Sequence, residues 1–133
     1  MNSIELIRSA TMTPNVPYAY SAVVQGVNRL VFTAGACPLD AAGAIGPVGD
    51  ITGQAERVMV NLQEALREAG ADLPDVVKTT VYVASSRRED LVAAWSVVRQ
   101  HLGEHDAPST LLGVATLGYP EQLVEVEAIA ALQ

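Results

Sequence analysis

The segment Val124-Glu125-Val126-Glu127-Ala128-Ile129-Ala130 alternates apolar and charged or small residues near the end of the chain. Strict alternation places successive side chains on opposite faces of a β-strand. It therefore predicts a strand over residues 123–132, with Glu125 and Glu127 on one face because they lie two positions apart. Two carboxylates on one strand face make this segment both an architectural element and a candidate site.

Short apolar segments predict further strands in the rest of the chain. The predicted strands are Ile4–Ile7, Tyr20–Val27, Leu30–Ala34, Val76–Ala84 and Thr110–Leu117. Asn28 supplies turn chemistry between the second and third of them, which predicts a hairpin. The segment from Pro38 to Asp50 is rich in Gly, Ala, Pro and Asp, and its length is typical of a rim or lid loop.

Two segments carry the three-and-four spacing of an amphipathic helix. The first has its apolar stripe at Ala55, Val58, Met59, Leu62, Ala65, Leu66 and Ala69. Asp50 or Thr52 can cap its start, and Gly70 suits a left-handed position after its end. The second begins at Ser86, where Ser86 and Glu89 can form a capping box. Its stripe, Leu91, Ala94, Trp95, Val98 and Leu102, predicts a core role for the tryptophan.

The resulting order, βββαβαββ, predicts an α+β fold with a mostly antiparallel sheet and two helices on one face. Several strands are nevertheless apolar on both faces: Leu111 and Leu117 oppose Leu112 and Val114, and Ile129 opposes Val124 and Val126. Two helices can cover only one face. We therefore expect a second copy of the chain to cover the other face.

Composition narrows the functional classes. The 133 residues predict one domain, residues 1–133, with a formal charge of −7 and no Lys or Arg after Arg99. That charge disfavours binding to nucleic acid. Two histidines and one cysteine without ligand spacing predict no metal site. The sequence shows neither a secretory signal nor an apolar membrane-spanning run, and the single thiol of Cys37 fits a reducing cytoplasm.

Each candidate site residue also has a structural interpretation. Glu125 is either a water-orienting base or part of a solvated strand face paired with Lys78. Cys37 lacks a visible activating base, so it is predicted to be an inert buried side chain that can still line a cleft. Tyr119, in the turn 118–121, is either a ligand lid or subunit contact, or an aromatic side chain that packs beside Pro120.

Five stretches of the chain, taken together, resemble the Rid (RidA/YjgF) family of imine deaminases, also labelled endoribonuclease L-PSP. They are residues 19–21 (AYS), 32–38 (FTAGACP), 61–70 from Asn61-Leu62 to Ala69-Gly70, 75–83 (DVVKTTVYV) and 124–130 (VEVEAIA). The resemblance covers residues 18–131 and implies a fold of the chorismate-mutase type. It also implies a homotrimer with ligand clefts between subunits, no cofactor, and hydrolysis of 2-imino or enamine acids to keto acids and ammonia.

The resemblance assigns the family's site positions to this chain. The glutamate that helps to hold the attacking water corresponds to Glu125, the cleft tyrosine to Tyr20 and the loop glycine to Gly35, with backbone groups near Cys37 also contacting the ligand. The substrate-clamping arginine corresponds to Ser109, and the cysteine two residues later corresponds to Leu111. Residues 109–117 contain no arginine.

Loss of the arginine predicts altered chemistry. A charge-assisted contact of this kind contributes about 1.5–3 kcal/mol. Ser109 and Thr110 can donate hydrogen bonds to a neutral or differently shaped ligand, or a basic residue (Arg8, Arg29 or Lys78) can reach the cleft from a neighbour. The alternatives to a deaminase are a trimer that binds a small molecule without turnover, and an endoribonuclease or translation inhibitor, which the negative charge disfavours.

Overall fold

A four-stranded sheet forms the centre of the computed structural model, which describes residues 3–133. The strand order is β3 (Arg29–Phe32), β6 (Val124–Leu132), β4 (Val76–Val83) and β5 (Ser109–Gly113). β3 and β4 both pair antiparallel with β6, whereas β4 and β5 are parallel. The α+β prediction is confirmed. The sheet is mixed, because the chain crosses back over it between β4 and β5.

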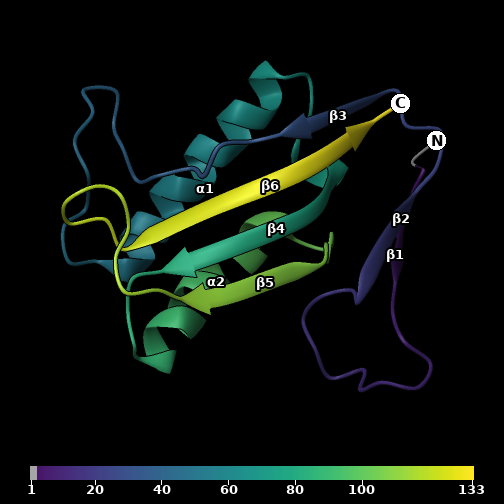
Figure 1. The fold of residues 1–133 in the computed structure, drawn as a ribbon, viewed down its shortest axis with the longest axis horizontal. Helices are drawn as coiled ribbons and strands as arrows, with labels where there is room; N and C mark the ends of the chain where they lie inside the picture. Colours follow the sequence, from purple (N-terminus) through teal and green to yellow (C-terminus); the bar gives the residue numbers. More distant parts are fainter. Residues whose placement is uncertain (1–2) are drawn as a thin grey trace.

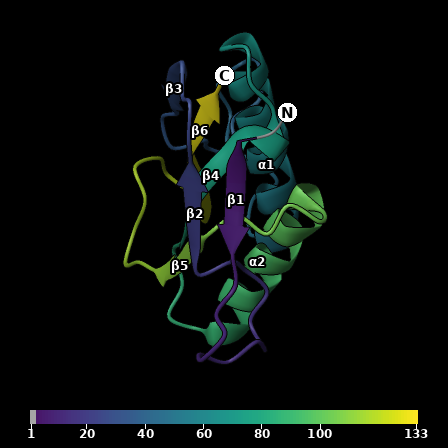
Figure 2. The same ribbon diagram turned by 90° about the vertical axis from the view of Figure 1, so that its right-hand side faces the viewer.

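Two helices cover one face of this sheet (Figure 2). They are α1 (Ile51–Glu68) and α2 (Arg88–Leu102), and a short 3-10 helix, Leu73–Asp75, precedes β4. Val124, Val126, Ala128 and Ala130 point from β6 into the core beneath the helices, where they are almost fully buried. Glu125 and Glu127 are less buried and lie on the other face, as the alternation predicts. Neither helix of residues 3–133 has the length and apolar character needed to cross a bilayer.

The ends of the first helix agree with the sequence. Asp50 caps α1 by accepting a hydrogen bond of 2.9 Å from the backbone N–H of Gly53. Gly70 follows the helix with a φ of 85°, in the left-handed region that favours glycine. The predicted Ser86–Glu89 capping box is wrong, because α2 begins two residues after Ser86. Ser85 organises this end instead: its hydroxyl donates to Asp90 at 2.7 Å.

A β-bulge interrupts the side-chain alternation of β4. The register with β6 shifts between Val76 and Lys78. The extra residue places Val76, with Thr79, on the helix-covered face, where both are fully buried. Strict alternation along residues 76–84 predicts Val76 on the same face as Lys78, which is wrong.

β1 (Ile4–Ile7) and β2 (Ser21–Val24) form a separate two-stranded antiparallel sheet beside the main one (Figure 1). The predicted hairpin between residues 20–27 and 30–34 is therefore wrong. The turn around Asn28 instead carries the chain from one sheet to the other, with the Asn28 N–H donating to the carbonyl of Leu132 at 2.8 Å. Sequence periodicity identified the strands but not their partners.

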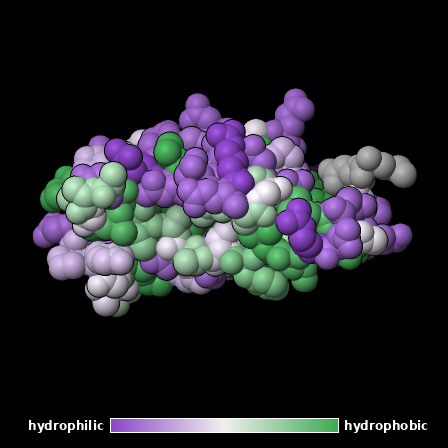
Figure 3. Space-filling view, turned by 90° about the horizontal axis from the view of Figure 1, so that it is seen from above, coloured by the Kyte–Doolittle hydropathy of each residue, from purple (hydrophilic) through white to green (hydrophobic). Residues whose placement is uncertain are grey.

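No helix or strand within residues 3–133 covers the second face of the main sheet (Figure 2). Leu30 and Phe32 of β3 are 55% and 69% exposed there. The middle of this face is more polar, since the Tyr82 hydroxyl donates to Glu127 at 2.7 Å and Lys78 donates to Thr110 at 2.8 Å. Seen from above, hydrophilic residues dominate the upper edge of the molecule, and more hydrophobic ones lie along the lower edge (Figure 3).

Candidate functional site

The carboxylate of Glu125 receives two uncharged donors at one oxygen. The Cys37 thiol lies 3.3 Å from Oε1 and the Gln122 amide nitrogen lies 3.2 Å from the same atom. Gln122 is almost fully buried, whereas Cys37 is only partly buried. The Glu125 carboxylate is therefore hydrogen-bonded to protein side chains and does not lie on a plain solvated strand face.

Gly35 lies directly against this carboxylate. A Cβ built on Gly35 would lie 2.6 Å from Cδ and 2.8 Å from Cγ of Glu125, and closer still to Oε2. A side chain at position 35 would therefore require the Glu125 carboxyl group to move. The resemblance placed Gly35 and Glu125 in one site, and the structure brings them into contact.

Burial and the neighbouring carboxylate make Cys37 a weak acid. Desolvation, followed by the hydrogen bond to Glu125 and its negative charge, raises the pKa of the Cys37 thiol to about 11. The thiol is the protonated donor at neutral pH, so it is not a nucleophile there. Cys37 is only partly buried, whereas the sequence predicted a buried side chain, and its contact with Glu125 was not predicted.

Two amide side chains of α1, the buried Gln54 and the partly buried Asn61, hold the two loops that carry these donors. Gln54 of α1 donates to the carbonyl of Glu121 at 3.0 Å and accepts from the N–H of Leu123 at 2.8 Å. Asn61 of the same helix donates to the carbonyls of Cys37 and Leu39, each at 2.9 Å. One helix thus positions both loops around Glu125.

Ser109 and Thr110 lie at a different place. With Tyr18, Trp95 and Leu111 they line a cavity of about 450 Å³. The Ser109 hydroxyl lies 2.6 Å from that of Thr79 and donates to the carbonyl of Ala107 at 3.0 Å. This volume lies within the range of small-molecule sites.

Of the three basic residues considered for the missing clamp, Lys78 contacts a predicted site residue, Thr110. Arg8 is engaged elsewhere: it forms an ion pair with Asp106 at 2.6 Å and also donates to the carbonyl of Tyr18. Gly70 is the residue against which the Arg29 guanidinium lies. Within the described residues, Lys78 is thus the candidate cation beside this part of the sheet.

Tyr20 is near the cavity but does not line it. Its hydroxyl donates to the carbonyl of Thr13 at 2.7 Å, and its ring meets Tyr18 edge to face with the centroids 6.0 Å apart. Tyr18 is the aromatic residue that faces the cavity. The sequence could not separate the two, because they are two residues apart in a segment without regular structure.

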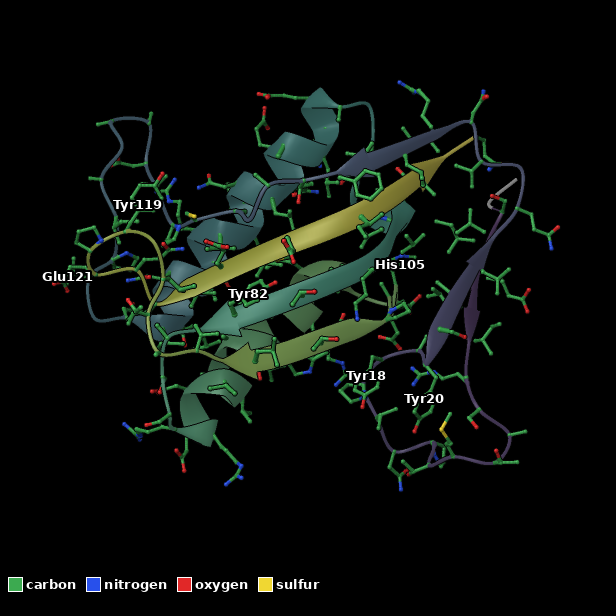
Figure 4. All side chains as sticks on the ribbon, viewed as in Figure 1. Tyr18, Tyr20, Tyr82, His105, Tyr119 and Glu121 are labelled. Atoms are coloured by element: carbon green, nitrogen blue, oxygen red, sulfur yellow. The ribbon has the colours of Figure 1, made fainter. Side chains whose placement is uncertain are left out.

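Tyr119 has an exposed ring, and its backbone N–H donates to the Gln122 side chain at 3.1 Å. It therefore reaches the Glu125 group through the backbone. Figure 4 shows Tyr119 at one end of the sheet and Tyr18 and Tyr20 at the other. The predicted site residues thus form two groups within one chain: Gly35, Cys37, Tyr119 and Glu125 at the first end, and Ser109 and Thr110, with Tyr20 nearby, at the second.

The open face of the sheet holds a smaller cavity of about 170 Å³ between these two groups. Phe32, Lys78, Thr80, Glu127 and Ile129 are among the residues that line it. Glu127 takes its hydrogen bond from Tyr82, where the structural interpretation had paired the carboxylates with Lys78. The carboxylate of Glu127 is therefore held by a hydrogen bond to the neighbouring strand β4.

Sequence reasoning missed three site residues. Gln122 gave no signal, since an isolated glutamine in a turn carries no pattern. Tyr18 and Trp95 gave weak ones: Trp95 fits the helix stripe, and it does pack on the core while also lining the larger cavity. Among residues 3–133, no group of three His, Cys, Asp or Glu side chains is placed to hold a metal ion.

Comparison with known proteins identifies the family of this chain. The family described as Endoribonuclease L-PSP matches residues 11–132. A 2-iminobutanoate/2-iminopropanoate deaminase of Salmonella typhimurium is 33% identical over 125 residues, which are 89% of this chain and 93% of that protein.

Two solved structures share the fold. A Rid-family protein of unknown function from Yersinia pestis has a TM-score of 0.87 at 32% identity, covering 98% of this chain and 99% of the other. TdcF of E. coli, solved with bound serine, has a TM-score of 0.68 at 27% identity, covering 96% and 94%. Since the family match spans nearly the whole chain and the fold agrees with that of a Rid-family structure, the chain belongs to the Rid/YjgF/L-PSP family.

Proposed function

We propose that this protein hydrolyses small imines or enamines to carbonyl compounds and ammonia, with Glu125 as the residue that orients and deprotonates water. The single observation that carries the proposal is the carboxylate of Glu125, held at one oxygen by two neutral donors and seated on Gly35. The related enzyme named 2-iminobutanoate/2-iminopropanoate deaminase supports the reaction class.

The chemistry needs only water. Water attacks the carbon of the protonated imine while Glu125 accepts one of its protons, which gives a neutral carbinolamine and a protonated carboxyl. The carboxyl returns this proton to the nitrogen. The C–N bond then breaks, ammonia leaves, and the hydroxyl oxygen becomes the carbonyl oxygen as it gives its proton to the Glu125 carboxylate, from which the proton passes to ammonia or water. An enamine enters this sequence once protonation at its carbon has made the imine. No step requires a metal or a cofactor.

The site of this reaction is proposed to be a cleft between subunits of a homotrimer. Within one chain, the Glu125 group and the Ser109–Thr110 cavity lie apart (Figure 4), and a neighbouring copy is proposed to bring its own cavity next to the Glu125 group. The uncovered face with Leu30 and Phe32 supports such an assembly. Each subunit is proposed to act as one domain in the cytoplasm, without nucleic-acid or membrane partners.

Substrate range is proposed to differ from that of members that carry the arginine. The resemblance assigns the arginine position to Ser109, whose hydroxyl is already bonded to Thr79 and Ala107. A cavity with two aromatic side chains and hydroxyl groups suits neutral groups better than a carboxylate. We expect Ser109→Arg to increase activity on carboxylate-bearing imines by about tenfold or more.

The deciding experiment is release of keto acid from enzymatically generated 2-aminoacrylate or 2-aminocrotonate, with and without the protein. Acceleration that is lost in Glu125→Gln supports the proposal. A folded protein that accelerates neither substrate, before or after Ser109→Arg, would reject it. In that case a compound that raises the melting temperature without being consumed would favour the non-catalytic binder.

A further inference from the structure

We infer that Cys37 and Gln122 are positioning residues for Glu125: two neutral donors fix Oε1 and leave Oε2 as the oxygen available to a substrate water. The inference deepens the proposed function and rests on it for the reaction that Oε2 serves. The contacts themselves stand independently of that reaction, because both donors converge on one atom. Among residues 3–133, no donor approaches Oε2 within hydrogen-bonding distance, nor is Oε2 among buried atoms left unpaired.

The orientation of the Gln122 amide follows from its other partners. Its oxygen accepts the backbone N–H of Tyr119 at 3.1 Å, and its nitrogen donates to the carbonyl of Val124 at 3.2 Å. An N–H can only donate and a carbonyl can only accept, so the amide cannot be turned over without losing both bonds. The group that faces Glu125 is therefore the NH₂ donor.

The loop that carries Gln122 is held in an uncommon conformation. Glu121 has a φ of 67°, in the left-handed region that residues with a side chain seldom adopt. Gln54, fully buried, bonds to the backbone on both sides of Gln122, at Glu121 and Leu123. The hydrogen bonds of the buried Gln54 side chain thus stabilise the strained backbone of this turn. In this conformation the Gln122 side chain points toward Glu125.

The thiol of Cys37 is the second donor. Its sulfur lies 3.3 Å from Oε1 of Glu125 and 3.5 Å from the carbonyl oxygen of Gly35, and it has one proton to donate. The carboxylate is both the nearer and the charged acceptor, so it takes that proton. Asn61 fixes the thiol by holding the Cys37 carbonyl.

Gly35 completes the arrangement on the side of Oε2. Because no Cβ occupies this space, the free oxygen lies over the glycine backbone instead of being pushed away. The carboxylate therefore has one oxygen committed to protein donors and one open oxygen in a fixed place. A base with this asymmetry keeps its orientation between turnovers, which is the property of a positioned catalytic group.

The first test measures the thiol and needs no substrate. Mass spectrometry follows the rate of iodoacetamide alkylation of Cys37 at about pH 8.5. The wild-type protein is compared with Glu125→Gln and with Glu127→Gln, which is the matched control on the same strand face. Loss of the charged acceptor should speed alkylation by about tenfold in Glu125→Gln, with no change in Glu127→Gln. Equal rates in all three proteins would overturn the inference.

The second test measures turnover. Cys37→Ala and Gln122→Met should each lower kcat by about tenfold with KM within about twofold, whereas Cys37→Ser, which keeps a donor, should retain most of the activity. Equal losses in Cys37→Ala and Cys37→Ser would overturn the positioning role of the thiol. If alkylation responds to Glu125→Gln but no deaminase activity exists, the contact stands and the proposed function fails.

Discussion

A single missing side chain at Gly35 gives the most local prediction. Gly35→Ala would place a Cβ inside the space now taken by the carboxyl group of Glu125, 2.6 Å from Cδ. The carboxylate must move, and misplacement of a catalytic group by about 1 Å costs about a hundredfold in rate. We expect keto-acid release to fall by about that factor. Gly118→Ala, where a Cβ meets nothing within 4 Å, is the control and should remain active.

The Cys37 thiol gives a pH prediction at the same scale. Burial, with the hydrogen bond to Glu125 and its charge, raises the pKa of the thiol from 9.0 to about 11. Between these values the unfolded chain has lost the thiol proton while the folded protein retains it. The stability that this group contributes is therefore complete below about pH 9 and is lost as the pH rises through about 11.

Urea denaturation at pH 8 and pH 10.5 checks this prediction. The midpoint should fall more between the two pH values in the wild-type protein than in Cys37→Ser, whose hydroxyl does not ionise in this range. Other groups, such as Tyr82, also titrate at high pH, but they are common to both proteins and cancel in the comparison. The same pH dependence in both would mean that the thiol is not linked to folding.

Some of the site can be read from single residues and some cannot. Alternation places Glu125 away from the core, and the family resemblance places Gly35 beside it; both follow from local pattern. The position of Gln122 depends on a left-handed turn at Glu121 and on the buried amide of Gln54, which is 67 residues from Glu121 along the chain. No property of the sequence around residue 122 encodes that contact, so only the folded chain reveals it.

At the scale of elements, α1 acts as the support for two loops through Gln54. Gln54→Met keeps the shape of the side chain but leaves the N–H of Leu123 and the carbonyl of Glu121 without their partner, whereas the carbonyl of Pro47 retains the Asp50 N–H at 3.4 Å. Unpaired buried groups cost about 1–3 kcal/mol each, so we expect a loss of about 2–4 kcal/mol in the free energy of unfolding.

Chemical denaturation measures that loss, and Gln63→Met on the same helix is the matched control. Gln63 is less buried and donates one hydrogen bond, to Asp72 at 2.9 Å, so its replacement should cost about 1 kcal/mol or less. Because Gln54 also holds the backbone around Gln122, its variant should lose activity under conditions where it remains folded. Equal effects of the two substitutions would contradict the special role of Gln54.

Hydrophobic periodicity predicted helices and strands correctly where the pattern extends over a complete element. It did not predict which strands pair with one another. The stripe of α1 and the alternation of β6 each extend over a complete element, and both elements form as expected. The bulge in β4 and the separate β1–β2 sheet are choices of pairing, which depend on distant strands rather than on local sequence. The end of β5 at Gly113 also depends on a residue distant in sequence. Because glycine has no side chain, the backbone at Gly113 can pass close to the carbonyl of Ser85.

At the scale of the whole molecule, the uncovered face of the main sheet makes the oligomeric state the most informative property to measure. We expect the wild-type protein to sediment at about three times the 14.0 kDa mass of the chain. Phe32→Asp introduces a charge on the most exposed apolar side chain of this face, which is 69% exposed in the isolated chain. If a neighbouring copy covers Phe32, burial of an unpaired carboxylate should dissociate the trimer.

Val92→Asp is the matched control, since Val92 is 59% exposed on α2, on the opposite side of the sheet. It should leave both mass and activity unchanged. The Glu125 group and the Ser109–Thr110 cavity lie at opposite ends of the sheet in one subunit (Figure 4). Dissociation of the trimer by Phe32→Asp should therefore abolish turnover. Circular dichroism should show that the dissociated monomer remains folded. A wild-type protein that sediments as a 14.0 kDa monomer would reject the trimer. A dissociated Phe32→Asp that still turns over substrate would instead place the complete reaction within one chain, at the Glu125 group alone.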